Sequence, residues 1–217
     1  MQVLLILAGE PPSLDLIKTF WDSSALHVAV DGGIQCFKDH SLPPDLHLGD
    51  MDSADPYSVG DKTHVALDDQ AHTDLEKSLH YLMSMYEVHS WVILGGGGGR
   101  VDHLFNNLQF CASLPAHHKV LFVNDIGSQY HPDRREGREL LFRLKCGQLT
   151  DLRVSVGTTI SILPVGQIAG LRTSGLEWEI HGEINNKEAI LSQSNRAMVT
   201  DPSFTLSDGS AYIVVYQ

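Results

Sequence analysis

Strand and helix patterns alternate along the first part of this chain. A continuous apolar run at Val3–Ala8, ended by Gly9, is typical of a buried strand, and the apolar spacing of Leu14–Trp21 predicts a helix. The alternation continues, with further strands predicted at residues 27–30, 46–48, 65–67, 91–94 and 120–123 and further helices at 34–40, 75–86 and 103–114. Strands that alternate with helices predict an α/β domain, a mostly parallel sheet with helices on both faces.

Beyond about residue 130 the pattern changes to short strands. The segment Tyr130–Glu139 is polar and charged and contains Pro132. After it, strand patterns separated by Gly, Ser, Asn and Asp occur at residues 140–144, 159–163, 177–180, 189–192 and 211–216. Short strands at this spacing predict an antiparallel β-sandwich. We therefore predict an α/β domain at residues 1–132 and a β-sandwich domain at residues 133–217.

The composition argues against several classes of protein. Hydrophobic residues make up 42% of the 217 residues, as in a packed globular protein, and the net charge of -12 argues against binding to nucleic acid. Cys36, Cys111 and Cys146 form no CxxC motif, and the twelve histidines lack zinc-site spacing. No apolar run is long enough to span a membrane, and Met1–Gly9 lacks the basic flank of a signal peptide. We expect a cytoplasmic protein that binds neither nucleic acid nor membrane.

Two aspartates flank Met51 in the segment Gly49–Ser53. Alternate residues of an extended segment face the same way, so Asp50 and Asp52 would point together. Adjacent carboxylates repel each other unless a cation lies between them, and Mg²⁺ prefers such oxygen ligands. The segment is a candidate metal site, and an Asp-rich turn is the alternative. Asp31, before two glycines at the end of another predicted strand, is a weaker candidate of the same type.

A helix start is predicted at Thr73, because Thr73 and Glu76 have the spacing of a capping box. Asp74 then occupies the first helical position, and Lys77 lies about one turn later on the same face. A lysine near the positive end of a helix is unusual unless Asp74 or a bound anion offsets its charge. The alternative is structural: Asp74 favours the helix dipole and Lys77 is solvated.

Five glycines, Gly95–Gly99, lie between a predicted buried strand and a predicted helix. Such a loop lets backbone N–H groups approach phosphate oxygens, and Arg100 is suited to bind a phosphate through two hydrogen bonds. Asp102 either caps the helix or binds metal or substrate. The run is neither a Walker A motif nor a regular GxGxxG, and a flexible linker is the alternative. Because all three polar segments follow strands of one predicted sheet, together they favour a site for a Mg²⁺–nucleotide complex.

Motifs along nearly the whole chain occur in an order and spacing typical of one enzyme family. The first part contains Asp31-Gly32-Gly33, Gly49–Ser53, Asp69-Gln70 with Thr73-Asp74 and Lys77, and Gly99–His103 with Asn107. The second part contains Ile160–Pro164, Gly175–Trp178 and Ser192–Asn195. Together these motifs resemble the thiamine pyrophosphokinase family. The chain departs from the family pattern in having five glycines, where fewer usually suffice, and Met51, where an aromatic residue is common.

The resemblance implies transfer of pyrophosphate from ATP to the hydroxyl of thiamine, giving thiamine diphosphate and AMP. It also implies a homodimer whose active sites lie between the subunits. The implied Mg²⁺ ligands are Asp50, Asp52 and Asp74, and the other implied catalytic residues are Lys77, Arg100 and Asp102. The residues implied to line the ATP or thiamine sites are Asp31, Asp69, Gln70, Gly99, His103, Asn107, Trp178, Ser192, Ser194 and Asn195. Asp74 and Asp102 are both candidates for the general base.

Other functions share parts of this pattern. A kinase that transfers a single phosphate, or a Mg²⁺-dependent nucleotide hydrolase, would contain the same acidic clusters and glycine loop. A module that senses thiamine without turnover is disfavoured, because the candidate metal ligands are all present. A structural dimerisation protein gives no reason for charged residues to gather at strand ends. Trp178 has an alternative of its own, an aromatic residue in the core of the sandwich.

Overall fold

The structure, a computed structural model, describes residues 1–49, 63–98, 100–127, 136–147, 149–181 and 192–217. These residues form two compact units. One consists of Met1–Phe110 with His118–Asp125, and the other of Cys111–His117 with Ile126–Gln217. The predicted boundary between residues 132 and 133 lies within 128–135, outside the described residues, and stays a prediction.

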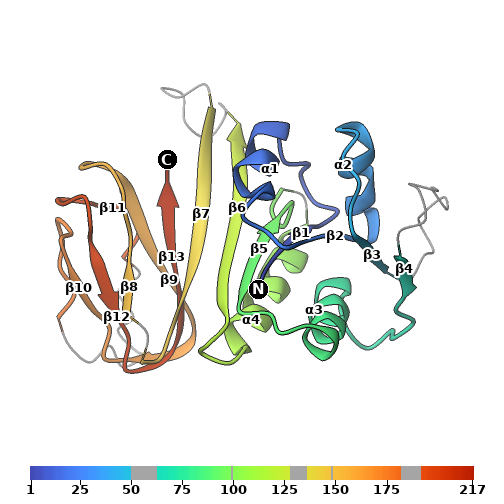
Figure 1. The fold of residues 1–217 in the computed structure, drawn as a ribbon. Coiled ribbons are helices and arrows are strands. Elements are labelled where there is room, and N and C mark those ends of the chain that lie inside the picture. The colour runs from blue at the N-terminus through green and yellow to red at the C-terminus, as the bar shows by residue number, and fades with distance from the viewer. Residues whose placement is uncertain (50–62, 99, 128–135, 148, 182–191) are drawn as a thin grey trace. The chain divides into compact units, whose positions relative to one another are not determined.

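The first unit is built on a parallel sheet. Its strands are β1 (Gln2–Ile6), β2 (Leu26–Val30), β3 (Leu46–Gly49), β4 (Thr63–Ala66), β5 (Ser90–Leu94) and the first part of β6 (Lys119–Gly127). Their order is β4-β3-β2-β1-β5-β6, and neighbouring strands are parallel. Figure 1 shows α1 (Leu14–Trp21) and α2 (Ile34–Asp39) on one side of this sheet and α3 (Asp74–Met85) and α4 (Val101–Ser113) on the other. The predicted α/β fold of the first part is confirmed.

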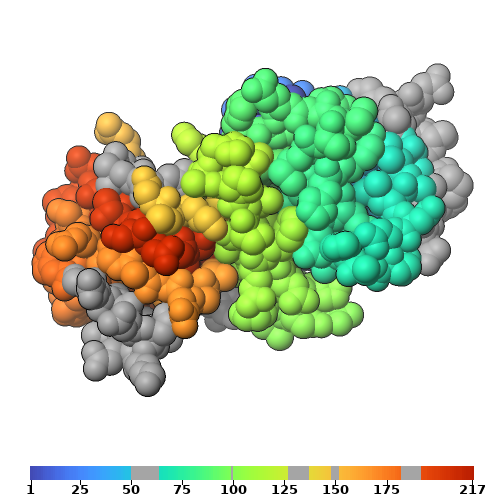
Figure 2. Space-filling view, turned by 90° about the horizontal axis from the view of Figure 1, so that it is seen from below, coloured from blue at the N-terminus to red at the C-terminus, as the bar shows by residue number. Residues whose placement is uncertain are grey.

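Helices α1, α2 and α3 begin within one residue of their predicted starts, whereas α4, predicted from residue 103, begins at Val101. Ser13 caps α1, and its hydroxyl accepts a backbone N–H three residues later. Thr73 and Glu76 form the predicted capping box of α3, in which the Thr73 N–H donates to the Glu76 carboxylate at 2.9 Å. Helices α3 and α4 lie side by side on the face seen in Figure 2, and the rings of His80 and Phe110 meet between them. In the described part of the chain, no helix combines the length and apolar character needed to cross a membrane.

The central position of β1 determines where a ligand can bind. Its residues Val3–Ile6 expose none of their surface, as expected for a strand covered on both faces. Because β1 lies between β2 and β5 and runs parallel to both, the loops that follow these three strands meet at one edge of the sheet.

The second unit is an antiparallel sandwich. One sheet has the order β11-β9-β13-β7, from β7 (Glu136–Lys145), β9 (Thr159–Ala169), β11 (Asn195–Arg196) and β13 (Asp208–Tyr216). The other has the order β10-β12-β8, from β8 (Leu149–Asp151), β10 (Arg172–Ser174) and β12 (Ser203–Thr205). Neighbouring strands in both are antiparallel. One apolar core includes Ile160 and Ile213 of the first sheet and Phe204 of the second, which confirms the predicted β-sandwich.

Two cations of β7 hold the C-terminal end of α4. The guanidinium of Arg143 donates hydrogen bonds to the backbone oxygens of Cys111, Leu114 and Pro115, at 2.9, 2.7 and 3.0 Å. Lys145 Nζ donates to the backbone oxygen of Ala112 at 2.7 Å. The last carbonyls of a helix lack partners within the helix, and cations near them are favourable, so these side chains anchor the helix end.

One predicted strand of the second unit is wrong. Residues 177–180 form a bend, and the neighbouring Leu176 and His181 make isolated bridges to Ala197 and Arg172. The physical reason is that side chains take backbone N–H groups of this segment that a strand would pair with a neighbour: Asn195 Oδ1 accepts the N–H of Trp178, and Thr173 Oγ1 accepts that of Ile180. The strand predicted at residues 189–192 lies almost entirely outside the described residues.

Candidate active site

A pocket of about 680 Å³ opens at the carboxyl ends of β1, β2 and β5 in the first unit. Its walls are the segment after β1 (residues 7–10), the end of β2, the start of α3 (residues 73–75) and the glycine loop (residues 95–98). The carboxyl edge of an open parallel sheet is where such folds bind ligands. Of the predicted site residues, the pocket brings together Asp31, Asp74, Arg100, His103 and Asn107.

The glycine loop is fixed against the segment that follows β1. The N–H groups of Gly9 and Glu10 donate to the carbonyl oxygens of Gly95 and Gly97, each at 2.9 Å. A Cβ atom on Gly9 would lie 2.3 Å from the Gly95 oxygen, so the two segments approach too closely for any side chain. The Gly97 N–H donates to Asn124 Oδ1 at 3.1 Å. These contacts disagree with a flexible linker, and they show that the N–H of Gly97 already has a partner within the protein.

Asp31 has an unusual backbone conformation at the end of β2. Its φ angle is 45°, in the left-handed region that non-glycine residues seldom adopt. Its Oδ1 atom is buried without a hydrogen-bond partner among the described residues, although the side chain lines the pocket. Buried polar atoms normally have partners, so this oxygen is positioned for a ligand that the pocket would bind.

Asp74 and Lys77 form the ion pair that their spacing predicts. Lys77 Nζ lies 2.8 Å from Asp74 Oδ1, and the side chains expose 5% and 39% of their surface. The alternative of a solvated Lys77 is therefore wrong. Asp74 lines the pocket, whereas Lys77 lies behind it and outside the lining residues. A buried ammonium requires a partner, so Lys77 holds the Asp74 carboxylate in one position.

Arg100 and Asp102 pair with each other at the start of α4. Arg100 Nε and Nη2 donate to Asp102 Oδ1 and Oδ2 at 3.2 and 2.5 Å. The hydrogen bond from Arg100 lowers the pKa of Asp102, so this carboxylate is ionised at neutral pH. The helix begins at Val101, which places Asp102 in the first turn and not at the cap. Both side chains are exposed, so Arg100 can exchange Asp102 for a phosphate at little cost.

Several predicted site residues lie elsewhere or outside the described part. Asp69 and Gln70 are exposed and do not line the pocket. The Asp69 carboxylate accepts the N–H of Ala71, which lowers its pKa, and pairs with His72 Nδ1 at 2.5 Å. Asp50, Asp52 and Gly99 lie outside the described residues. Within the described part, no group of three or more His, Cys, Asp or Glu side chains has the arrangement of a metal site.

Two residues at the pocket were not predicted from the sequence. Glu10 lines it, and Asn124 holds the glycine loop through Gly97. Asn124 directly follows the apolar run 120–123, just as Asp31 follows β2. A polar residue that directly ends a predicted apolar strand is the signal that would have identified Asn124, although β6 itself continues to Gly127.

In the second unit Trp178 is exposed, with 59% of its surface accessible. The alternative of a core aromatic is therefore wrong. The buried amide of Asn195 fixes the Trp178 backbone: its Oδ1 accepts the Trp178 N–H at 3.2 Å, and its Nδ2 donates to the Trp178 oxygen at 2.7 Å. Asn195 Nδ2 also donates to Ser192 Oγ at 3.0 Å. The neighbouring Ser194 is exposed, with a φ angle of 57°. The hydrogen bonds of Asn195 favour a positioning role for it.

Glu179, which no sequence motif marks, binds the residues that precede Trp178 in the chain. Its carboxylate accepts hydrogen bonds from Gly175 N–H at 2.6 Å, Leu176 N–H at 3.0 Å and Thr173 Oγ1 at 2.7 Å. Burial alone would raise the pKa of Glu179, but these three hydrogen bonds outweigh it and lower the pKa. The carboxylate is therefore ionised, and it stabilises the bend, at neutral pH.

We expect Glu179→Gln to lower the free energy of unfolding at pH 7 by about 1 kcal/mol, because a neutral amide accepts these hydrogen bonds less strongly. A lowered folded-state pKa means that the stabilisation is present above the ordinary carboxylate pKa and is lost as the pH falls through the folded-state value. Urea unfolding from pH 7 down to about 3 should show the two proteins converging. Glu177→Gln, an exposed neighbour, is the control. Equal effects of the two substitutions, or a loss independent of pH, would contradict the role of Glu179.

An open parallel sheet with a glycine loop, three carboxylates and an arginine at one pocket has the arrangement of the nucleotide-using α/β enzymes. Residues 17–123 match the family model described as "Thiamin pyrophosphokinase, catalytic domain", and residues 148–210 match "Thiamin pyrophosphokinase, vitamin B1 binding domain". The chain therefore belongs to the thiamin pyrophosphokinase family, and it is an enzyme.

Individual relatives agree with this assignment. The chain is 28% identical over 224 residues to "Thiamin pyrophosphokinase 1" of Caenorhabditis elegans, covering 97% of this chain and 87% of the relative. The thiamine pyrophosphokinase structure from Bacillus subtilis has a TM-score of 0.79 at 19% identity, over 99% of this chain and 98% of that one. The thiamin pyrophosphokinase structure from Candida albicans has a TM-score of 0.79 at 19% identity, over 100% of this chain and 89% of that one. The solved structures support the two-part fold.

Proposed function

We propose that this chain transfers pyrophosphate from ATP to the hydroxyl of thiamine, and that ATP binds in the pocket beside the glycine loop. The observation that carries the proposal is the match of both parts of the chain to the catalytic and vitamin B1-binding domains of one family. The products of this reaction are thiamine diphosphate and AMP.

The transfer is a substitution at the β-phosphorus of ATP. The hydroxyl oxygen of thiamine forms a bond to that phosphorus, and the bond from it to the oxygen shared with the α-phosphorus breaks. AMP leaves with that oxygen, and the hydroxyl proton passes to a base. Such a reaction depends mainly on in-line positioning and on stabilisation of phosphate charge. Asp74 lines the pocket and Asp102 does not, but Asp74 is also a proposed ligand of Mg²⁺, and metal binding makes a carboxylate a poor base.

Different residues around the pocket supply the positioning and the stabilisation of phosphate charge. The close approach of the glycine loop to Gly9 gives a rigid wall of main chain against which phosphates can lie, with the Glu10 side chain beside it at Gly98. Arg100 exchanges Asp102 for phosphate oxygens, which it is suited to bind with two hydrogen bonds. Lys77 fixes Asp74, so that the carboxylate enters the reaction already oriented. His103 and Asn107 line the same pocket from α4 and contact the nucleotide.

The donor set at the pocket fits Mg²⁺. Asp31 offers a buried oxygen that has no partner among the described residues, Asp74 lines the same pocket, and Gly49, which leads into Asp50 and Asp52, packs against Asp31. Carboxylate oxygens are the ligands that Mg²⁺ prefers. We propose that Asp50, Asp52 and Asp74 hold the ion and that Asp31 faces it. When bound, Mg²⁺ neutralises phosphate charge.

Thiamine binding is assigned to the bend of the second unit. An exposed tryptophan held through its backbone by Asn195 and supported by Glu179 is suited to stack on an aromatic ring. Ser192 and Ser194 supply hydroxyls beside it. We propose that a second copy of the chain completes the site in a homodimer, as the family resemblance implies. Free thiols at all three cysteines suit the reducing cytoplasm in which we propose that the enzyme acts.

Incubation of the purified protein with ATP, Mg²⁺ and thiamine, followed by identification of the products, tests the proposal. AMP and thiamine diphosphate should form in equal amounts, and only when both thiamine and Mg²⁺ are present. Formation of ADP and thiamine monophosphate would place the attack on the γ-phosphorus. The absence of any thiamine-dependent consumption of ATP would overturn the proposed function.

A further inference from the structure

His47 contacts the backbone of Asp31 from the neighbouring strand. Its Nε2 lies 2.9 Å from the Asp31 carbonyl oxygen, to which it donates a hydrogen bond. The same oxygen accepts the N–H of Ile34 at the end of the short 3-10 helix Asp31–Gly33. Two donors from different elements therefore fix the peptide plane that follows Asp31.

The close packing of β3 also limits how Asp31 can move. A Cβ atom on Gly49, at the end of β3, would lie 3.1 Å from the Asp31 Cα atom. A Cβ atom on Gly33 would lie 2.0 Å from the Ile6 carbonyl oxygen, so the chain after Asp31 is pressed against β1. Both glycines are required because the backbone around Asp31 is enclosed on two sides.

This enclosure matters because Asp31 is held in the left-handed region, with a φ angle of 45°. Such a conformation persists only where the surroundings impose it. The direction of the Asp31 carboxylate depends on this backbone, and its Oδ1 atom is buried without a hydrogen bond from the described residues. The hydrogen bond from His47 is the side-chain contact that acts on the Asp31 carbonyl from outside its own segment.

We propose that His47 is a positioning residue for the reaction: it holds Asp31 in the conformation that presents its carboxylate to the Mg²⁺–nucleotide complex. The inference rests on the proposed function, and it assigns His47 no contact with substrate. Loss of a hydrogen-bond partner behind a metal-facing or substrate-facing group typically costs about 10- to 100-fold in activity or metal affinity. We expect a loss in that range when His47 can no longer donate.

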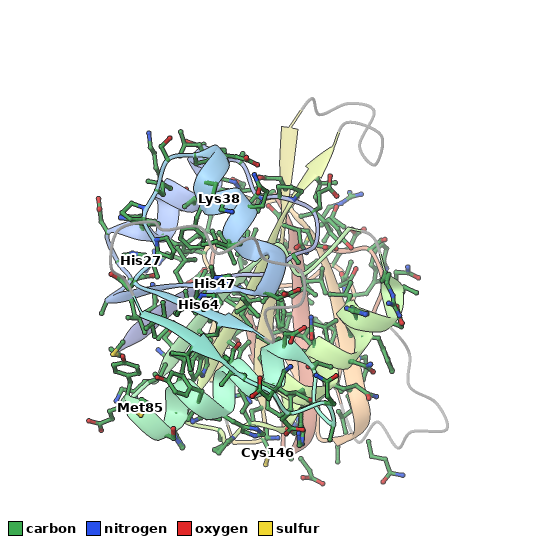
Figure 3. All side chains as sticks on the ribbon, turned by 90° about the vertical axis from the view of Figure 1, so that its right-hand side faces the viewer. His27, Lys38, His47, His64, Met85 and Cys146 are labelled. Atoms are coloured by element: carbon green, nitrogen blue, oxygen red, sulfur yellow. The ribbon has the colours of Figure 1, made fainter. Side chains whose placement is uncertain are left out.

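The chain offers a matched control in His64. His64 lies opposite His47 on β4, and their rings meet edge to face with centroids 4.5 Å apart. Figure 3 shows the two rings side by side. His64 is exposed and contacts the ring of His47. Removing His64 therefore disturbs the same region of the sheet and leaves the hydrogen bond to Asp31 in place.

The test compares His47→Leu, His47→Gln and His64→Leu with the wild type. Leucine removes the donor, whereas the glutamine amide carries an N–H at about the reach of Nε2. For each protein, kcat, KM for ATP and the Mg²⁺ concentration for half-maximal activity are measured. Calorimetric titration with α,β-methylene ATP and Mg²⁺ adds a readout that needs no turnover. The melting temperature reports on folding.

The inference predicts that His47→Leu lowers kcat or weakens Mg²⁺–nucleotide binding by about 10-fold or more, that His47→Gln restores most of the loss, and that His64→Leu resembles the wild type. Equal activity of all variants, equal losses in His47→Leu and His64→Leu, or no rescue by glutamine would overturn it. A wild type that forms no AMP from ATP and thiamine would instead overturn the proposed function.

Discussion

Asp31→Asn is expected to lower kcat/KM for ATP by about 100-fold or more while leaving the fold intact. Asparagine has nearly the same shape as aspartate and tolerates the left-handed backbone that Asp31 adopts, so the substitution removes the charge and little else. A neutral amide neither holds Mg²⁺ well nor orients a cation-bound phosphate. Steady-state kinetics with ATP and thiamine at several Mg²⁺ concentrations measure the effect.

Asp31→Asn is expected to lower activity without lowering thermal stability. A carboxylate with a buried oxygen that no described residue partners costs stability, so the variant should melt at the same temperature as the wild type or higher. Asp22→Asn, at an exposed aspartate of the same unit, is the control and should change neither property. Wild-type kinetics in Asp31→Asn would remove Asp31 from the site, and a large drop in melting temperature would give it a structural role instead.

The elements around the pocket could be predicted because their causes are local in the sequence. The capping box of Thr73 and Glu76 identifies the start of α3, and the same short segment contains the Asp74–Lys77 ion pair. The apolar runs of the buried strands end at polar or glycine residues, which places Asp31 and the glycine loop at strand ends. The order of these signals predicted both the parallel sheet and the edge of it at which the pocket opens.

The contacts that shape the pocket could not be predicted, because they join residues far apart in the chain. Asn124 reaches Gly97, and the backbone of Glu10 bonds to that same residue, through pairings that only the folded sheet creates. The left-handed conformation of Asp31 is likewise imposed by β3, through Gly49 and His47. Each of these contacts depends on which strands are neighbours, and local patterns carry no such information.

One wrong prediction and one rejected alternative concern polar groups whose partners the fold decides. The segment at residues 177–180 alternates charged and apolar residues as a half-buried strand does, but the side chains of Asn195 and Thr173 accept the N–H groups of Trp178 and Ile180 that a strand would pair with a neighbour. Lys77 could be read as a solvated side chain at a helix start, whereas packing buries it and Asp74 provides its counter-charge. In both cases the folded structure decides which partner a polar group takes.

Arg143→Met is expected to lower the free energy of unfolding by about 3 kcal/mol, which corresponds to about 10 °C in melting temperature for a chain of this length. Arg143 is 4% exposed. Its guanidinium donates to the backbone oxygen of Cys111, in the last turn of α4, and to those of Leu114 and Pro115, which directly follow the helix. Methionine fills a similar volume but donates no hydrogen bond, so the substitution leaves buried carbonyl groups without partners. Thermal and urea unfolding followed by circular dichroism measure the loss.

Two further substitutions separate the hydrogen bonds of Arg143 from its charge. Arg143→Lys keeps the positive charge near the helix end. The lysine ammonium lacks the planar set of donors with which the guanidinium reaches all three oxygens, so an intermediate loss of stability is expected. Arg153→Met, at an exposed arginine of the same unit, removes a charge without a buried contact and should change the free energy of unfolding by less than about 0.5 kcal/mol. If Arg143→Met and Arg153→Met cost the same, net charge would explain the effect. If Arg143→Lys were as stable as the wild type, a single cation at the helix end would be sufficient for stability, and the three directed hydrogen bonds would contribute little.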